Sequence, residues 1–207
     1  MRQAVVCACV AGCLGIILLV VASTTPMVRW LCVWQIKSIA SAARAHPEAE
    51  LHAKALLGIA QGPTGSSVQQ FRAVYAVSEL GQLGPAASPI ILDIADLLDS
   101  PCDSVSQQAA RALRNLRSVS APAADRIAQR VGNDQRDATT WLAVRSLGAC
   151  GVAAEKHIPL LRTLEGHEPE MFRNAVARAI EAIESDVARR DKVRWRSPES
   201  PVSPVGL

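Results

Sequence analysis

The chain has 207 residues, is 49% hydrophobic and contains only 3% aromatic residues. This length allows one domain of ordinary size together with an N-terminal anchor. So few aromatic residues disfavour a β-sandwich or a barrel, whose strands are rich in aromatic and β-branched side chains.

The net charge of +3 is divided unevenly along the chain. Between Glu48 and Glu184 there are 13 Lys and Arg residues against 16 Asp and Glu residues, so this part carries about −3. The two ends hold the other 9 basic and 3 acidic residues. A nucleic-acid-binding domain usually concentrates basic residues on its folded body, so no nucleic-acid partner is expected.

The chain begins with an apolar segment, in which Ala4 to Ala22 are 19 residues without a charge. As a helix this stretch would measure about 28 Å, close to the hydrocarbon thickness of a bilayer. We predict that residues 1–23 form a transmembrane signal anchor or a signal peptide. The length favours an uncleaved anchor, whereas Val20-Val21-Ala22 would suit a signal peptidase. A lipoprotein signal at Cys13 is disfavoured, because the apolar core follows this cysteine.

The expected location depends on this segment. An uncleaved anchor would make the protein a single-pass membrane protein, and a lone N-terminal anchor more often exports the rest of the chain. Cleavage would make the protein secreted.

Residues 24–46 are predicted to form an amphipathic helix beside the membrane. Trp30 and Trp34 are four residues apart, so they share one face of a helix. Tryptophans this close to a span suit the headgroup layer of the membrane. Alternatively, they pack on the first folded unit of the chain.

The middle of the chain repeats. Each unit has an aliphatic anchor, with a small or β-branched residue four positions earlier and an apolar residue three positions later. A helical repeat of this period cannot bury its apolar face alone and stacks on its neighbours. The anchors, separated by steps of 33, 34 and 33 residues, are Leu80, Leu113, Leu147 and Ile180.

Each of the first three units is predicted to contain two helices. The first unit has one helix over about 68–83 and a second that begins at Ser88-Pro89 and ends near Ser100. The fourth unit has a single helix, and a helix over about 47–60 caps the beginning of the stack. Residues 47–185 therefore form the folded domain, and residues 186–207 are predicted to be a basic, Pro- and Ser-rich disordered tail.

The repeated segments Ala76-Val77-Ser78-Glu79-Leu80-Gly81 and Ala143-Val144-Arg145-Ser146-Leu147-Gly148 resemble HEAT repeats. The resemblance is to the short bacterial kind related to phycobilin-lyase repeats, and it covers about residues 71–183. It implies an all-α fold, a right-handed α-solenoid of about three and a half helical hairpins. Unit two has Arg114 where the other two units have glycine, so its turn is expected to differ.

No catalytic, cofactor-binding or metal site is predicted. The four histidines are scattered, and neither a Cys-x-x-Cys pair nor a phosphate-binding glycine loop occurs. We therefore expect a protein that is not an enzyme and that has no small-molecule substrate. Cys150 takes the place of a leucine in the repeat and is predicted to be a buried apolar side chain.

The expected function is that of a membrane-tethered scaffold that binds a protein partner on the exposed face of its second helices. Charged side chains on those helices are the candidates for the contact, unless they are paired with one another across the rim. A lyase-like enzyme is an alternative by resemblance to bilin lyases, and so is binding of nucleic acid or anionic lipid by the basic tail. The candidate partner-binding residues are Asp93, Asp96, Arg126 and Arg162.

Overall fold

The computed structural model describes residues 26–45, 49–133, 137–167 and 169–196. This part of the chain is all-helical and contains no strand. The α-helices are α2 (Pro26–Ala45), α3 (Ala49–Ala60), α4 (Ser67–Leu80), α5 (Ile91–Asp96), α6 (Asp103–Leu116), α7 (Ala124–Gly132), α8 (Ala138–Ala149), α9 (Ile158–Thr163) and α10 (Glu170–Arg196). The shorter 3-10 helices are η1 (Gly84–Ile90), η2 (Leu97–Asp99), η3 (Arg117–Ala123) and η4 (Gly151–His157).

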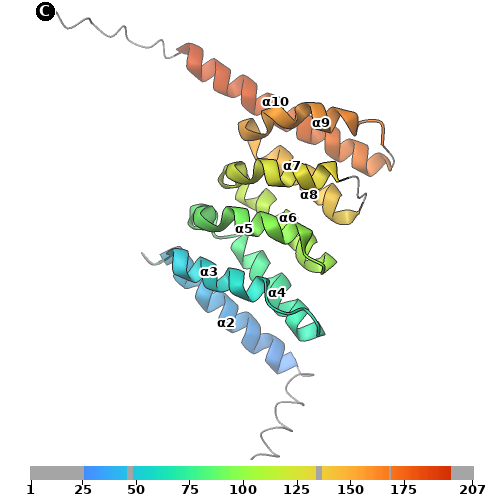
Figure 1. Cartoon of the computed structure of the whole chain (residues 1–207). Coiled ribbons are helices and arrows are strands. Elements are labelled where there is room, and N and C mark those ends of the chain that lie inside the picture. The colour runs from blue at the N-terminus through green and yellow to red at the C-terminus, as the bar shows by residue number, and fades with distance from the viewer. Residues whose placement is uncertain (1–25, 46–48, 134–136, 168, 197–207) are drawn as a thin grey trace, which may run out of the picture.

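The helices lie in two layers (Figure 1). The rear layer contains α2, α4, α6, α8 and α10, and each of these helices packs on the next. The front layer contains α3, α5, α7 and α9 with the 3-10 helices beside them. Among the described residues, α4 makes no substantial contact with α8 or α10. The apolar core is therefore built between successive neighbours.

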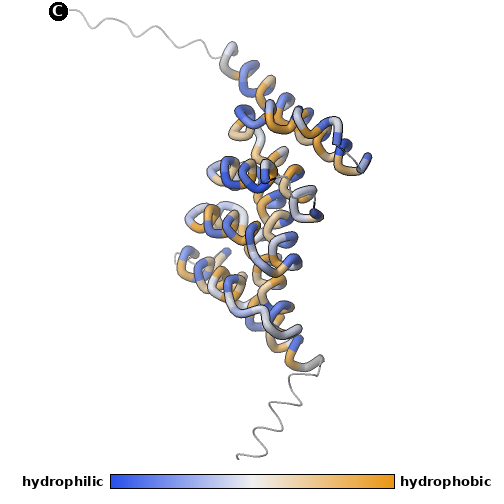
Figure 2. Tube along the Cα trace, turned by 45° about the vertical axis from the view of Figure 1, so that its right-hand side comes forward, coloured by the Kyte–Doolittle hydropathy of each residue, from blue (hydrophilic) through white to orange (hydrophobic). Residues whose placement is uncertain are grey.

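The repeated positions of the sequence form this core. Leu80, Leu113 and Leu147 are fully buried, as are the small residues that precede them by four positions. Hydrophobic residues recur in every helix of the stack beside polar ones (Figure 2). Ala177, three positions before its anchor, is exposed, whereas the residues at that place in the other units, Val77, Ala110 and Val144, are buried. It lies on α10, the last helix of the described stack.

A sharp turn connects the two layers in each of the first three units. Gly84 has a φ of +58° and Gly151 a φ of +61°, and Arg117 reaches +51° at the same place in unit two. The turn of unit two therefore shares the positive φ of the others, and the expected difference lies in the preceding helix: α6 continues to Leu116, past its anchor, whereas α4 ends at its anchor Leu80. Each turn continues into a 3-10 helix, so α5 begins at Ile91, later than the predicted start at Ser88-Pro89.

The segment predicted to lie beside the membrane forms part of the packed domain. α2 pairs with α3 and also packs on α4, with Ile36, Ala40 and Ala43 buried. The guanidinium of Arg44 lies 2.9 Å from the buried carboxylate of Glu79 on α4. The boundary predicted near residue 46 is therefore wrong, and α2 with α3 forms an additional helical hairpin.

The exposed tryptophans of α2 do not pack on the first unit. Trp30 is 64% exposed and Trp34 is 63% exposed, and Leu31 beside them is also exposed. The alternative in which these two side chains are buried in the stack is therefore wrong. Within the described ranges, no helix is both long enough and apolar enough to cross a membrane. The predicted anchor, residues 1–23, lies outside these ranges.

The last helix is longer than predicted. α10 continues to Arg196, so residues 186–196 are helical where a disordered tail was expected. Val187 packs against the core, and Arg190 pairs with Glu155 at 3.0 Å. The first helix-breaking residue after α10 begins is Pro198, which explains why the helix continues this far. The rest of the predicted tail, residues 197–207, lies outside the described residues.

Candidate partner-binding surface

The four predicted partner-binding residues lie on the front layer, where three of them are involved in ion pairs. Arg126 on α7 lies 2.8 Å from Asp96 on α5, and it also reaches Asp99 at 3.4 Å. Arg162 on α9 pairs with Glu184 on α10 at 3.1 Å. The structure thus brings Asp96 and Arg126 together. Arg162 lies on α9, in the next unit, and is not part of this pair.

Asp93, the fourth of these residues, lies near a lysine of α3. The hydrogen bond from Lys54 to Glu50 raises the pKa of Lys54, and the nearby charge of Asp93 raises it further. Lys54 is itself paired with Glu50, so Asp93 stands beside this pair.

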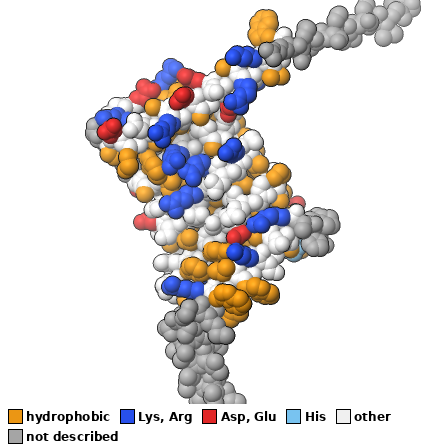
Figure 3. Space-filling view, turned by 180° about the vertical axis from the view of Figure 1, so that it is seen from behind, with side chains coloured by type: hydrophobic (Ala, Val, Ile, Leu, Met, Phe, Trp, Pro, Cys, Tyr) orange, Lys and Arg blue, Asp and Glu red, His pale blue; other side chains and the backbone are white. Residues whose placement is uncertain are grey.

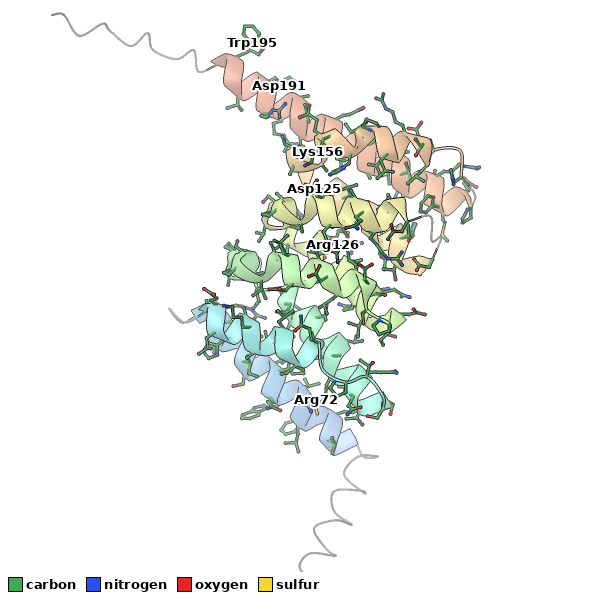
Figure 4. All side chains as sticks on the ribbon, in the orientation of Figure 1. Arg72, Asp125, Arg126, Lys156, Asp191 and Trp195 are labelled. Atoms are coloured by element: carbon green, nitrogen blue, oxygen red, sulfur yellow. The ribbon has the colours of Figure 1, made fainter. Side chains whose placement is uncertain are left out.

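The pairing continues along the front layer toward the C-terminus (Figure 4). Asp125 on α7 accepts hydrogen bonds from Lys156 at 2.9 Å and interacts with His157 at 2.8 Å. The hydrogen bonds from Lys156 and from His157 lower the pKa of Asp125. The charges of this face are thus largely matched by other charges of the same chain, which leaves little for a partner to recognise.

The rear layer carries a different set of charges. Arg111 and Arg114 extend from α6, Trp141 and Arg145 from α8, and Arg178 from α10. We call these five residues the arginine surface. Within the described residues, none of its four arginines forms an ion pair with a carboxylate. Figure 3 shows Lys and Arg side chains gathered on this face over the C-terminal helices, next to a hydrophobic patch.

Trp141 holds the centre of the arginine surface in place. Its indole Nε1 donates a hydrogen bond to the backbone oxygen of Met171 at 3.3 Å, which links α8 to the start of α10. The guanidinium of Arg145 lies 4.9 Å from the centre of the indole ring. This cation–π contact orients the guanidinium without neutralising its charge.

Arg114 lies where the arginines crowd together. Partial burial lowers its pKa, and repulsion from Arg145 and Arg111 lowers it further. A guanidinium remains charged in spite of such a shift, so the cost is stored as unfavourable electrostatic energy. An anion bound here would relieve that cost.

The arginine surface borders a shallow hollow of about 490 Å³ between α6, α8 and α10. No acidic side chain lines it. Its lining consists of Arg114, Trp141, Arg145, Gly148, Ala149, Met171, Asn174, Ala175, Arg178, Ala179 and Ala182.

A second hollow, of about 1260 Å³, adjoins the first and shares Arg114 with it. Its far side is lined by Asp186, Arg189 and Arg190. Arg189 pairs with Asp186 at 3.2 Å, and Arg190 pairs with Glu155. The unmatched positive charge is therefore greatest at the first hollow.

The repeat itself explains why the arginines meet. A Cβ on Gly81 would lie 2.7 Å from the Cα of Ala112, and one on Gly148 would lie 2.9 Å from the Cα of Ala179. These two pairs of small residues, each 31 positions apart, let the helices of two junctions approach closely. At the middle junction, between α6 and α8, the residues at the places of the glycine and the alanine are Arg114 and Ser146. Arg114 thus stands where the flanking junctions have a glycine, and it lies close enough to Arg145 on α8 for the two charges to repel.

Part of the arginine surface can be recognised in the sequence. Arg111, Arg114 and Arg117 are spaced by three and form a basic stripe in the sequence, but this spacing does not point to Trp141, Arg145 or Arg178. Arg111, Arg145 and Arg178 each precede the anchor of their unit by two positions. A comparison of the units at that position would have found them.

The described residues contain no group of three or more His, Cys, Asp or Glu side chains that could hold a metal ion. Cys150 is buried as predicted, and burial raises the pKa of its thiol, although a hydrogen bond with Ser120 partly opposes this. A thiol of raised pKa is a poor nucleophile at neutral pH.

Comparisons with known proteins bear on the fold alone. No protein-family model matches the chain, and no curated protein matches its sequence. Among solved structures, a crystal structure titled as an engineered protein from the Northeast Structural Genomics Consortium is similar with a TM-score of 0.52 and 19% identity. The match covers 73% of this chain and 72% of that one. A second engineered protein from the same consortium is 19% identical with a TM-score of 0.46, and the match covers 47% of its chain.

Proposed function

We propose that this protein is a scaffold that binds a partner protein through the arginine surface. In this proposal the helices form a right-handed, HEAT-like α-solenoid, to which α2 and α3 add a first hairpin. Residues 1–23 tether it to a membrane, with the solenoid on the exported side. The protein acts by binding and not by catalysis.

The observation that carries the proposal is the difference between the two faces of the stack. On the front face, charged residues such as Arg126 and Arg162 are paired within the chain. On the rear face, Arg114, Arg145 and Arg178 line a hollow that contains no carboxylate. Unmatched charge beside a partly exposed tryptophan is typical of a surface that a partner completes, since arginine and tryptophan are enriched at such contacts. We therefore place the docking site on the rear face and not on the predicted front face.

Photo-crosslinking in the native cell tests this proposal. A photoreactive amino acid is placed at Asn174, which is exposed on the arginine surface, or at Leu92, which is exposed on α5. We expect a discrete crosslinked protein from position 174 and none from position 92. Crosslinks from position 92 alone would contradict the choice of face, and the absence of protein crosslinks from either position would contradict the scaffold function.

Protease treatment of intact and lysed cells tests the tether. The proposal expects the helical domain to be cleaved from outside intact cells or spheroplasts while a short N-terminal fragment stays with the membrane. Cleavage only after lysis would place the domain on the other side.

A further inference from the structure

Three arginines of the rear layer form a ladder along the stack. Arg111 on α6, Arg145 on α8 and Arg178 on α10 occupy the same position of consecutive units, two residues before each anchor. All three side chains are exposed. Packed helices lie about 8–10 Å apart, so the arginines of the ladder recur at about that distance. Arg114 stands beside the ladder, between its first two members.

This spacing matches an extended polypeptide. An extended chain in the polyproline II conformation advances about 3.1 Å per residue with three residues per turn, so side chains three residues apart lie on one face at about the distance between neighbouring arginines. A guanidinium binds a carboxylate through two parallel hydrogen bonds, which makes arginine selective for carboxylate geometry. The exposed Met171 provides apolar area beside the ladder for the residues between the acids.

We propose that the arginine surface binds an acidic protein segment in extended conformation, with Asp or Glu at about every third residue. The carboxylates of this segment pair with Arg111, Arg145 and Arg178, and Arg114 lies within reach of those on the α6–α8 side. The inference rests on the proposed scaffold function and specifies the chemistry of its partner.

The charge distribution favours such a segment over a nucleic acid. Between Glu48 and Glu184 the chain carries 13 basic against 16 acidic residues, so apart from the four arginines of this surface the range is acidic on balance. Further along α10, Arg189 and Arg190 are paired with Asp186 and Glu155. A long polyanion would therefore meet acidic or already paired side chains beyond the ladder. Proteins that bind single-stranded nucleic acid stack bases on open aromatic faces, but the guanidinium of Arg145 lies over the ring of Trp141.

Fluorescence anisotropy with designed peptides tests the proposal. The full chain is placed in nanodiscs of neutral phosphatidylcholine. The probe is a labelled twelve-residue peptide, four repeats of Glu-Ala-Pro, in which proline prevents a helix. A second peptide has the same composition with its four glutamates adjacent. We expect the spaced peptide to bind at least fivefold more tightly, with an affinity that falls as salt increases.

Charge-reversal variants assign the binding to the ladder. Arg145→Glu with Arg178→Glu is expected to weaken binding of the spaced peptide at least tenfold. Arg162→Glu on the front face is the matched control and should change it less than twofold. If circular dichroism shows that the double variant does not fold, the single variants Arg145→Ala and Arg178→Ala are measured instead. Each is expected to lower the affinity for the spaced peptide at least threefold.

Several results would overturn the inference. These are equal binding of the spaced and adjacent peptides, an equal effect of Arg162→Glu, or stronger competition by an oligonucleotide or by phosphatidylserine vesicles than by unlabelled spaced peptide. If crosslinks from position 174 still capture a protein while neither peptide binds, the scaffold function stands and the acidic extended segment is wrong.

Discussion

Arg117 occupies a backbone conformation that suits glycine. Its φ of +51° corresponds to the values of Gly84 and Gly151 in the equivalent turns, and a side chain is strained there. Arg117 also lines the larger hollow beside the arginine surface. A strained residue in such a place is consistent with a role in binding that outweighs its cost in stability.

Replacing Arg117 with glycine should therefore stabilise the protein. We expect Arg117→Gly to raise the free energy of unfolding by about 1 kcal/mol, because the relief of strain exceeds the added entropy of glycine in the unfolded chain. The shift of the urea midpoint measures it. Gly84→Ala is the control, since a Cβ there meets nothing within 4 Å and only the backbone strain remains. The free energy of unfolding of Gly84→Ala should be lower than that of the wild type by about 1 kcal/mol. An unchanged midpoint for both variants would contradict the argument.

Asp137 has two roles at the start of α8. It caps the helix by accepting a hydrogen bond from the backbone N–H of Thr140 at 2.7 Å, and it pairs with the buried guanidinium of Arg130. Burial works against its charged form, but the hydrogen bonds from Thr140 and the charge of Arg130 prevail and lower its pKa. Arg130 also lies 3.8 Å from Asp99, so Asp137 is its closer partner.

The lowered pKa of Asp137 gives its contribution a definite pH dependence. Because the carboxyl is more acidic in the folded state, its stabilising effect is complete above its ordinary pKa of 3.8 and is lost as the pH falls through the lower folded value. Asp137→Asn keeps a capping oxygen but removes the charge. We expect the difference in unfolding free energy between wild type and Asp137→Asn to be constant near neutral pH and to shrink below about pH 4. A difference that stays constant down to pH 2 would exclude the ionic contribution.

At the level of single residues, the sequence predicted the buried positions of the repeat, whereas its prediction of binding residues stays a prediction. The anchors and Cys150 were recognisable because their hydrophobic character recurs with the period of the repeat. Charge and expected exposure favour the front-face residues as partner-binding candidates. The sequence alone does not show that Arg126 faces Asp96 from the neighbouring unit. The recurrence of Arg111, Arg145 and Arg178 is visible in the sequence, but their lack of a carboxylate partner is seen only in the arrangement of the described residues.

The close contacts between rear helices depend on the absence of a side chain. At Gly148, an added Cβ would lie within 3.0 Å of both the Cα and the Cβ of Ala179. These neighbours are backbone and a short side chain, so they cannot rotate away, and the two helices must separate. The same applies at Gly81 against Ala112.

We expect Gly148→Ala to destabilise the protein by about 1–3 kcal/mol, the usual cost of overpacking a core. Gly58→Ala is the matched control. Gly58 lies within α3 with nothing near its Cβ position, so alanine there should stabilise by about 0.5–1 kcal/mol through helix propensity. Urea unfolding of the two variants measures both effects. Stabilisation by both substitutions would show that the junction between α8 and α10 is looser than described.

At the level of elements, the all-helical composition and the units from α4 to α10 followed from the sequence. The sequence does not predict that α2 packs on the folded domain. Its buried residues, Ile36, Ala40 and Ala43, do not lie 33 or 34 residues before Leu80, so the repeat pattern does not include them. The end of α10 was misjudged for another reason. The high charge density of residues 186–196 predicts disorder, but this stretch contains no proline or glycine that would end the helix.

The described part of the molecule is a row of helices in which each packs on its neighbours. Leu80 on α4 and Ile180 on α10 have equivalent places in their units, but their helices make no substantial contact. In such a row the stability of a unit depends on its own packing and on the adjoining interfaces. The arginine surface, which crosses α6, α8 and α10, requires three consecutive units to be folded at once.

A cavity near one end of the row should therefore weaken that end first. Leu56 on α3 and Leu161 on α9 are both fully buried, near opposite ends of the described stack. A Leu→Ala change in a core typically costs about 2–5 kcal/mol. Measured by amide hydrogen exchange, Leu56→Ala should reduce protection mainly in α2 to α4, and Leu161→Ala mainly in α8 to α10. An equal loss of protection across all helices in both variants would mean that the chain unfolds as one cooperative unit, contrary to an architecture of neighbour-only contacts.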